Sequence, residues 1–153
     1  MAAARRVSYV MWGAFVAAVG VYVFVAHLIG ASGGRPALTT FAKQIYNPGI
    51  IVLTVAMLGA MLLTERVRLA RLQAGPTSEQ IAAAVVRTIV MAQLMLAELV
   101  AVFGLMYFFQ GGPFDHMLHF CYVSWAMMLY ILIRMPSHFA AAEQAVAAGS
   151  PGL

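Results

Sequence analysis

The sequence predicts an all-α integral membrane protein, a four-helix bundle with both termini in the cytoplasm. The chain of 153 residues is 63% hydrophobic and only 9% charged, whereas soluble domains keep about a quarter of their residues charged. Four apolar segments are long enough to cross a bilayer, which requires about 20 helical residues. The basic residues adjoin alternate ends of these segments, a distribution that is typical of membrane proteins with a defined orientation.

The first predicted span covers residues 7–30. Arg5 and Arg6 precede it as they would precede a signal peptide, but the apolar stretch exceeds the roughly 7–15 residues of a signal's apolar region. We therefore expect this segment to be retained as a membrane helix. A loop bracketed by the sequences GASGGRP and YNPG follows, and residues 36–46 are expected to form a short surface helix within it.

The second predicted span covers residues 48–64, and its helix is expected to continue into the charged sequence TERVRLARLQ. The sequence AGPTSEQ then ends this helix and begins the next one. Thr77 or Ser78 is the expected N-cap and Glu79 follows in the first turn, positions at which these residue types are favoured.

The third span covers residues 81–109, and a tight QGGP turn connects it to the fourth span at residues 114–135. The sequence MPS is expected to end the fourth helix, and residues 140–153 are expected to form a flexible tail. With connections this short, residues 1–153 are predicted to form a single membrane domain.

Basic residues predict the orientation in the membrane. One side receives seven arginines, whereas the other receives only Arg35 and Lys43. The seven are Arg5, Arg6, Arg66, Arg68, Arg71, Arg87 and Arg134. Because cytoplasmic segments carry the excess of basic residues, both termini and the middle loop are predicted to be cytoplasmic, in a multi-pass protein of the inner (plasma) membrane. The basic residues are scattered beside apolar segments, so the net charge of +4 does not indicate nucleic-acid binding.

Glu98 is the principal candidate for a functional residue, because it lies in the middle of the third span, in TIVMAQLMLAELVAVFGLMYFF. A carboxylate at bilayer depth costs about 2.5–3.5 kcal/mol on insertion scales and usually faces a partner, a cavity or an ion path. Arg87 precedes it by about 16 Å of helix, which places the arginine at one membrane surface. Two roles remain open: an ion-binding site at Glu98 and Arg87, or a neutral acid that hydrogen-bonds to another helix or subunit.

The hairpin of the second and third spans resembles a known family in three places. These are the pair Arg87-Thr88 after a predicted cytoplasmic loop, the sequence AELVAVFGL that contains Glu98, and the Gly-Pro-Phe of residues 112–114. Together they resemble the outer helix of the c subunit of rotary ATP synthases. The resemblance implies that Glu98 binds and releases a translocated proton or sodium ion. The second span departs from the family's glycine-dense inner helix, since it contains only Gly49 and Gly59.

Histidines form a second candidate site at the opposite, outer ends of the helices. His116 and His119 are three residues apart, so they share one face of the fourth helix. His27 lies near the outer end of the first helix. Imidazoles from two helices could bind a metal or ligate haem b, and the same residues could contact a quinone. No metal or cofactor is the primary expectation, and haem b is the alternative.

The sequence contains no nucleotide-binding loop, paired-carboxylate site or nucleophile–base motif, so we expect that this chain alone is not an enzyme. The main hypothesis is a small subunit of a larger membrane complex, in which Glu98 contributes a proton-binding carboxylate to ion translocation. The alternatives are a haem- or quinone-associated anchor that uses His27, His116 and His119, and a purely structural accessory subunit. The expected partners are the lipid bilayer and other membrane subunits or further copies of this chain, and not nucleic acid.

Overall fold

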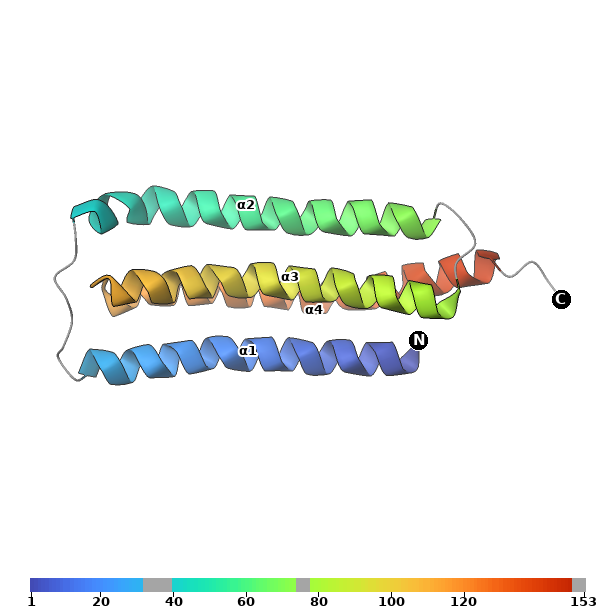
Figure 1. The fold of residues 1–153 in the computed structure, drawn as a ribbon, viewed down its shortest axis with the longest axis horizontal. Helices are drawn as coiled ribbons and strands as arrows, with labels where there is room; N and C mark the ends of the chain where they lie inside the picture. The colour runs from blue at the N-terminus through green and yellow to red at the C-terminus, as the bar shows by residue number, and fades with distance from the viewer. Residues whose placement is uncertain (32–39, 74–77, 150–153) are drawn as a thin grey trace.

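In a computed structural model the chain is all-α, and the residues that it describes, 1–31, 40–73 and 78–149, form four long helices (Figure 1). The helices are α1 (Ala2–Ala31), α2 (Thr40–Gln73), α3 (Glu79–Phe109) and α4 (Phe114–Gly149). Each of them contains a segment that is long and apolar enough to cross a membrane. The predicted helical class is therefore confirmed, and the four apolar helices indicate a multi-pass membrane protein.

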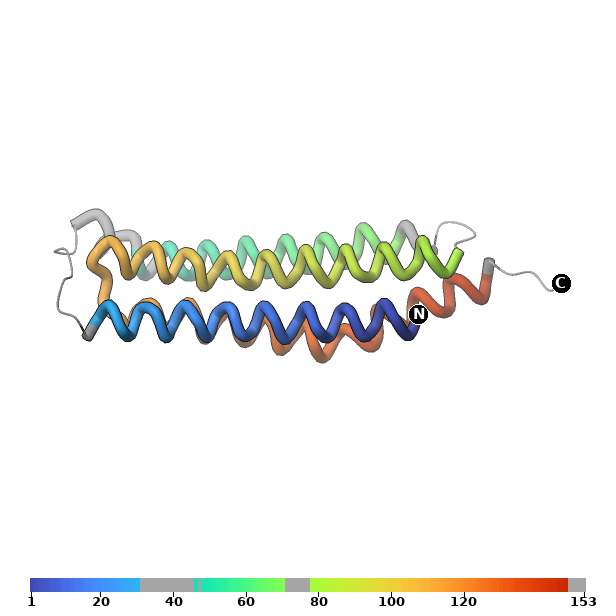
Figure 2. Tube along the Cα trace, turned by 60° about the horizontal axis from the view of Figure 1, so that its bottom comes forward, coloured from blue at the N-terminus to red at the C-terminus, as the bar shows by residue number. Residues whose placement is uncertain are grey.

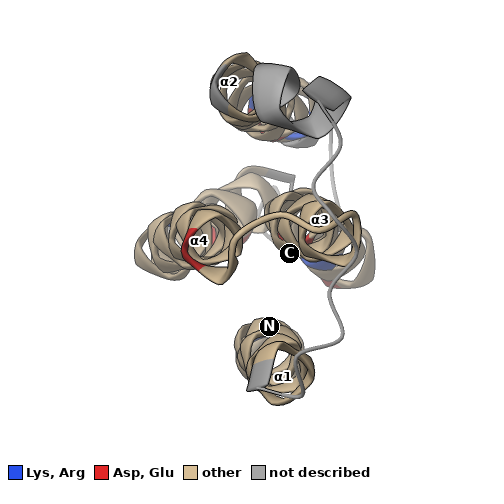
Figure 3. Ribbon diagram, turned by 90° about the vertical axis from the view of Figure 1, so that its left-hand side faces the viewer, with Lys and Arg blue, Asp and Glu red and all other residues tan. Residues whose placement is uncertain are grey.

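The helices run alternately up and down, so α1 begins and α4 ends at the same end of the bundle (Figure 1). Seen along the helices, α3 and α4 lie side by side at the centre, with α2 on one face of the pair and α1 on the other (Figure 3). The contacts between α3 and α4 are the most extensive, and among the described residues α1 and α2 do not touch. Consequently, each outer helix meets its own face of the central pair.

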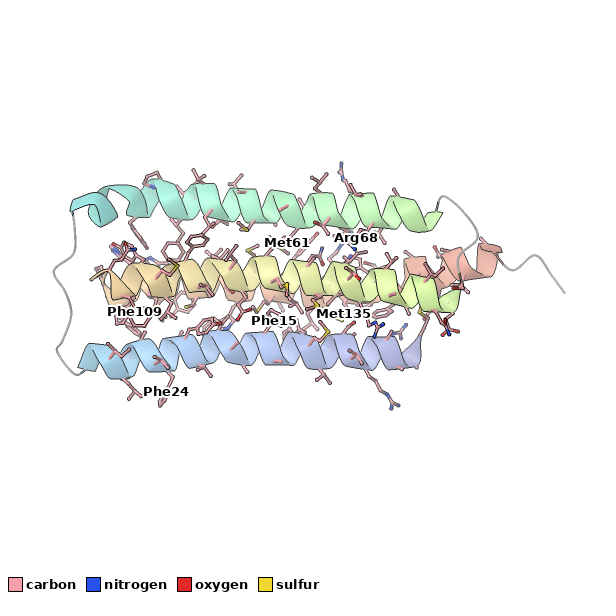
Figure 4. The ribbon with its side chains drawn as sticks, in the orientation of Figure 1. Phe15, Phe24, Met61, Arg68, Phe109 and Met135 are labelled. Carbon is pink, nitrogen blue, oxygen red and sulfur yellow. The ribbon has the colours of Figure 1, made fainter. Side chains whose placement is uncertain are left out.

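The core lies at the α3–α4 interface, where small residues permit a close approach. Ala97, Ala101 and Gly104 of α3 are buried, and a Cβ atom added to Gly104 would lie 2.5 Å from Cβ of Phe120. Small residues at such positions let membrane helices pack closely. Figure 4 shows Met61 of α2 pointing toward the central pair, whereas Phe24 of α1 points away from it.

Two local predictions about the ends of α3 are confirmed. Ser78 is the N-cap: its backbone is extended, at φ −70° and ψ 154°, and its hydroxyl accepts a hydrogen bond from the Ile81 N–H. Thr77, the other predicted N-cap, lies outside the described residues. At the far end the chain turns at Gly111, whose φ of 91° lies in the left-handed region that glycine adopts without steric cost.

The second apolar span begins at Pro48 as predicted, but the separate surface helix predicted before it was wrong. Residues 40–46 belong to α2, which passes through Pro48 and runs to Gln73, so they do not form a separate surface helix; residues 36–39 lie outside the described part. Proline removes one helical hydrogen bond and crowds the preceding turn, but the ring of Tyr46 in that turn is held against α4 by stacking on His116. The expected extension of the helix beyond residue 64 is confirmed.

The predicted end of the fourth helix was also wrong, because α4 continues through Pro136 to Gly149. Residues 140–149 are therefore helical instead of a flexible tail, and residues 150–153 lie outside the described part. The Ser137 hydroxyl donates to the Arg134 carbonyl, and the alanine-rich sequence that follows has high helix propensity. Phe139 is buried beneath Arg5 of α1, which anchors this extension. Figure 2 shows that the last part of α4 turns away from the line of the preceding turns.

Candidate functional site

Glu98 lies on the face of α3 that meets α1. The Tyr22 hydroxyl of α1 donates a hydrogen bond of 2.5 Å to Glu98 Oε1. Both side chains are half-buried, whereas the neighbouring Ala97 and Val100 are fully buried toward the core. The carboxyl therefore faces a neighbouring helix of the same chain, at the edge of the packed interior.

The sequence of α1 explains why Tyr22 faces the bundle. Val19 and Ala26 are both fully buried, and residues at spacings of three, four and seven share one helix face. Tyr22 lies between them on that face. The Trp12 indole N–H also donates to the Met128 carbonyl of α4 over 2.8 Å, which fixes α1 against the central pair several turns away.

Arg87 lies on the same face of α3 as Glu98. Their interval of 11 residues amounts to three turns with a remainder of about 20°, so both side chains project from the α1-facing side of α3. They are about 16 Å apart along the axis and do not pair directly. The Arg87 side chain is exposed, at the end of the bundle where α1 begins.

A groove between α1 and α3 extends from the end of the bundle past Arg87 to Met95. Its outer section has a volume of about 490 Å³ and its inner section about 390 Å³, and the two share Val7 and Arg87. The outer section is also lined by Glu79 and Gln80, whereas the inner section extends to Met95. Glu98 follows Met95 by one helical turn. The groove therefore changes from a polar opening to a more apolar inner part, which ends at Met95, one turn of α3 before Glu98.

A charged cluster that the sequence analysis missed joins α2 to α4. Glu65 is 4% exposed; it forms an ion pair with Arg134, and its Oε1 lies 3.3 Å from Nε2 of His138. His138 is 1% exposed. Glu65 follows the predicted second span, and His138 follows the predicted end of the fourth helix. The spacing of Arg134 and His138 could have indicated this cluster. If the fourth helix continues past Pro136, the two residues are four apart and share a helix face.

His116 and His119 belong to an aromatic cluster at the opposite end of the bundle. Tyr46 of α2 stacks on His116, with ring centroids 3.9 Å apart and planes 11° from parallel. Its hydroxyl lies 2.5 Å from Nδ1 of His119. The Tyr107 hydroxyl of α3 lies 3.3 Å from Nδ1 of His116. Three helices therefore contribute to the cluster, which we call the Tyr–His cluster: Tyr46, Tyr107, His116 and His119.

His27 lies apart from the Tyr–His cluster. Its ring packs against Phe114, with centroids 5.8 Å apart, and α1 lies on the opposite face of the central pair from α2 (Figure 3). The structure thus brings His116 and His119 together with two tyrosines but does not place His27 among them. In the described part of the chain, no three histidine, cysteine, aspartate or glutamate residues are grouped so that they could hold a metal ion.

Comparisons of the chain with protein-family models, curated proteins and solved structures found no match.

Proposed function

We propose that this protein is a proton-binding subunit of a membrane complex, with Glu98 as the group that takes up and releases the proton. The position of Glu98 carries the proposal: the carboxyl lies within an apolar helix and accepts a hydrogen bond from Tyr22 of a neighbouring helix. Ionisable groups at such depth are expensive and usually face a partner, a cavity or an ion path. A groove that opens beside Arg87 extends along α3 as far as Met95, one helical turn before Glu98, and we infer that protons reach the carboxyl from this side.

Tyr22 supports this role as a positioning residue. Its hydroxyl donates to one carboxyl oxygen and leaves the other oxygen for the proton. When Glu98 is neutral, the bond fixes the side chain against α1. When Glu98 is ionised, the same bond becomes charge-assisted and therefore stronger, which offsets part of the cost of a charge in apolar surroundings. The carboxyl thus keeps a partner in both protonation states, as reversible proton binding requires.

The arginines support an orientation in which the groove opens to the cytoplasm. Six of the seven arginines with the predicted cytoplasmic location have described side chains: Arg5, Arg6, Arg66, Arg68, Arg87 and Arg134. They lie toward the end of the bundle where α1 begins and α4 ends; Arg71, Arg35 and Lys43 lie outside the residues whose side chains are described. By the positive-inside rule, we infer that this end is cytoplasmic, in a multi-pass protein of the inner membrane.

The proposed partners are the lipid bilayer together with other membrane subunits or further copies of this chain. The outer faces of α1 and α2 expose large apolar side chains, such as Val10, Phe24, Val55 and Leu63, which suit both lipid and protein contacts. The resemblance of the α2–α3 hairpin to the c subunit of rotary ATP synthases supports a subunit whose carboxyl exchanges an ion.

Infrared difference spectroscopy between acidic and alkaline pH tests the proton-binding role in lipid vesicles. Wild-type protein should show a protonated carboxyl band that disappears at alkaline pH, and Glu98→Gln should lack it. Glu143→Gln is the matched control, because it removes a carboxylate that pairs with Arg5 at the exposed surface, and it should leave the band in place. A titrating band that persists in Glu98→Gln would contradict the proposal.

Copurification separates translocation from a purely structural role. If Glu98 carries protons, Glu98→Gln should assemble with the same partners as the wild type while ion movement by the complex is lost. Loss of the partners in Glu98→Gln would instead make Glu98 a structural contact between subunits.

A further inference from the structure

A second groove lies between α2 and α3, on the face of the central pair opposite to α1. Its volume is about 440 Å³, within the range of about 300–1,000 Å³ that is typical of small-ligand sites. Over most of its length the lining is apolar and includes Val52, Ala56 and Phe103. All three residues lie within the apolar spans and are exposed. The groove therefore opens toward the region that lipid occupies.

The polar groups of this groove are confined to its outer end. Tyr46, Tyr107 and Gln110 line that end, next to the turn between α3 and α4, whereas Ala56 lies nearly three turns of α2 further inward. The groove is therefore amphipathic along its axis: aromatic and hydrogen-bonding at one end, apolar from there toward the middle of the bundle.

The Tyr–His cluster gives the outer end a fixed aromatic surface. One face of the Tyr46 ring stacks on His116, and the Tyr46 hydroxyl is hydrogen-bonded to His119. Both histidines belong to α4, so contacts with α4 fix the position of the ring. The Tyr107 ring lies beside it, with centroids 5.2 Å apart. Burial raises the pKa of the Tyr46 hydroxyl, which keeps it neutral at physiological pH. Gln110 is exposed and brings an amide that can donate and accept hydrogen bonds.

We propose that this groove binds a membrane quinone, with the quinone ring against Tyr46 and Tyr107 and the isoprenoid tail along Val52, Ala56 and Phe103. A quinone ring is flat and carries carbonyl oxygens, so it suits an aromatic surface with hydrogen-bond donors nearby. Its tail requires an apolar channel open to lipid. A lipid acyl chain would fill the apolar part equally well, but it has no flat ring to lie against the two tyrosines at the outer end. The site lies on the opposite face from Glu98 and does not depend on the proposed proton-binding function.

Photoaffinity labelling of the full-length protein in lipid nanodiscs tests the site, with an azido derivative of decylubiquinone as the probe. The labelled peptides should come from the outer halves of α2 and α3, and excess decylubiquinone should suppress the labelling. Tyr107→Phe and Gln110→Leu each remove one neutral hydrogen-bonding group, worth about 0.5–1.5 kcal/mol, and should weaken the apparent affinity by about twofold to tenfold. Ala56→Leu should weaken it by filling the tail channel.

Matched controls lie on the lipid-facing side of α4. Tyr122→Phe and Ala126→Leu make the same chemical changes at exposed positions outside the groove, and they should leave labelling unchanged. Two outcomes would overturn the proposal. One is labelling spread over all exposed faces. The other is that a photoreactive fatty acid labels the same peptides and the Tyr107 and Gln110 variants do not change the labelling, which would show binding of acyl chains only.

Discussion

Glu65 of α2 and His138 of α4 lie 3.3 Å apart, measured from Oε1 to Nε2, with both side chains almost fully buried. Arg134, one turn before His138, pairs with the same carboxylate. A buried charge is tolerated when it is paired and becomes costly when its partner is removed. This cluster therefore links α2 to α4 at the arginine-rich end of the bundle. The Tyr22–Glu98 contact, by comparison, links α1 to α3.

Replacing Glu65 should destabilise the protein strongly. Glu65→Ala removes the carboxylate that pairs with Arg134, whose side chain is 45% exposed, and with the buried His138; hydrogen bonds to charged groups contribute about 1.5–3 kcal/mol. Thermal unfolding in detergent measures the effect. Glu143→Ala is the control, because Glu143 pairs with Arg5 at the exposed surface, where such pairs contribute little. Equal effects of the two substitutions would contradict a structural role of the buried cluster.

Replacing Tyr22 should change the environment of Glu98 while the carboxyl itself remains. Tyr22→Phe removes the donated hydrogen bond, so the C=O stretching band of protonated Glu98 should move to higher frequency. Stability should fall by about 0.5–1.5 kcal/mol, as for a typical hydrogen bond. Tyr9→Phe, at an exposed position of the same helix, should leave the band in place. An unchanged band in Tyr22→Phe would mean that this hydrogen bond does not form in the membrane.

Blocking the groove between α1 and α3 should slow proton exchange at Glu98. Met95 lines the inner section of the groove, and Met95→Trp should fill the end of this section that is nearest to Glu98 along α3. After a pH jump, time-resolved infrared spectra should show slower decay of the Glu98 band but the same final amplitude. Ile133→Trp adds the same bulk to a lipid-facing position of α4 and should leave the rate unchanged. If both variants exchange as fast as the wild type, protons reach Glu98 by another route.

Two glycine substitutions should have opposite effects on stability. Gly104→Ala places a methyl group 2.5 Å from Cβ of Phe120, and such overpacking typically costs about 1–3 kcal/mol. Gly59→Ala places its methyl in open space, with nothing within 4 Å, and should stabilise the helix by roughly 0.5–1 kcal/mol. Thermal unfolding of the two variants compares them directly. Equal shifts would contradict the close packing of α3 on α4.

Cysteine labelling tests the orientation in a Cys121→Ser background. Gln110→Cys lies at the turn between α3 and α4, and Gln80→Cys lies at the opposite end of α3; both positions are exposed. In intact cells, an impermeant thiol reagent should reach the first and not the second. The reverse pattern would place the termini outside and turn the groove of Glu98 toward the opposite compartment.

Several features were predictable from the sequence because their causes are local. The length of an apolar segment determines whether a helix can cross a bilayer, and the sequence indicated four such segments. The N-cap at Ser78 and the glycine turn at Gly111 follow from the conformations that these residues favour. Glu98 was identifiable because a mid-helix carboxyl is costly wherever that helix packs. The break between a surface helix and the second span at Pro48, and the helix end at Pro136, were mispredicted, because tertiary contacts of Tyr46 and Phe139 outweigh the local effect of proline.

Only the tertiary structure determined which residues meet. It paired Glu98 with Tyr22, Glu65 with His138, and the two outer histidines with Tyr46 and Tyr107, and it left His27 on the other face of the central pair. In a soluble bundle, the alternation of apolar and polar residues identifies the buried face of each helix. In lipid the exposed face is as apolar as the buried one, and helices associate through close packing and hydrogen bonds between them. The sequence therefore determined how many helices this protein has and which carboxyl is unusual, and the packing of helices distant in sequence decided what surrounds it.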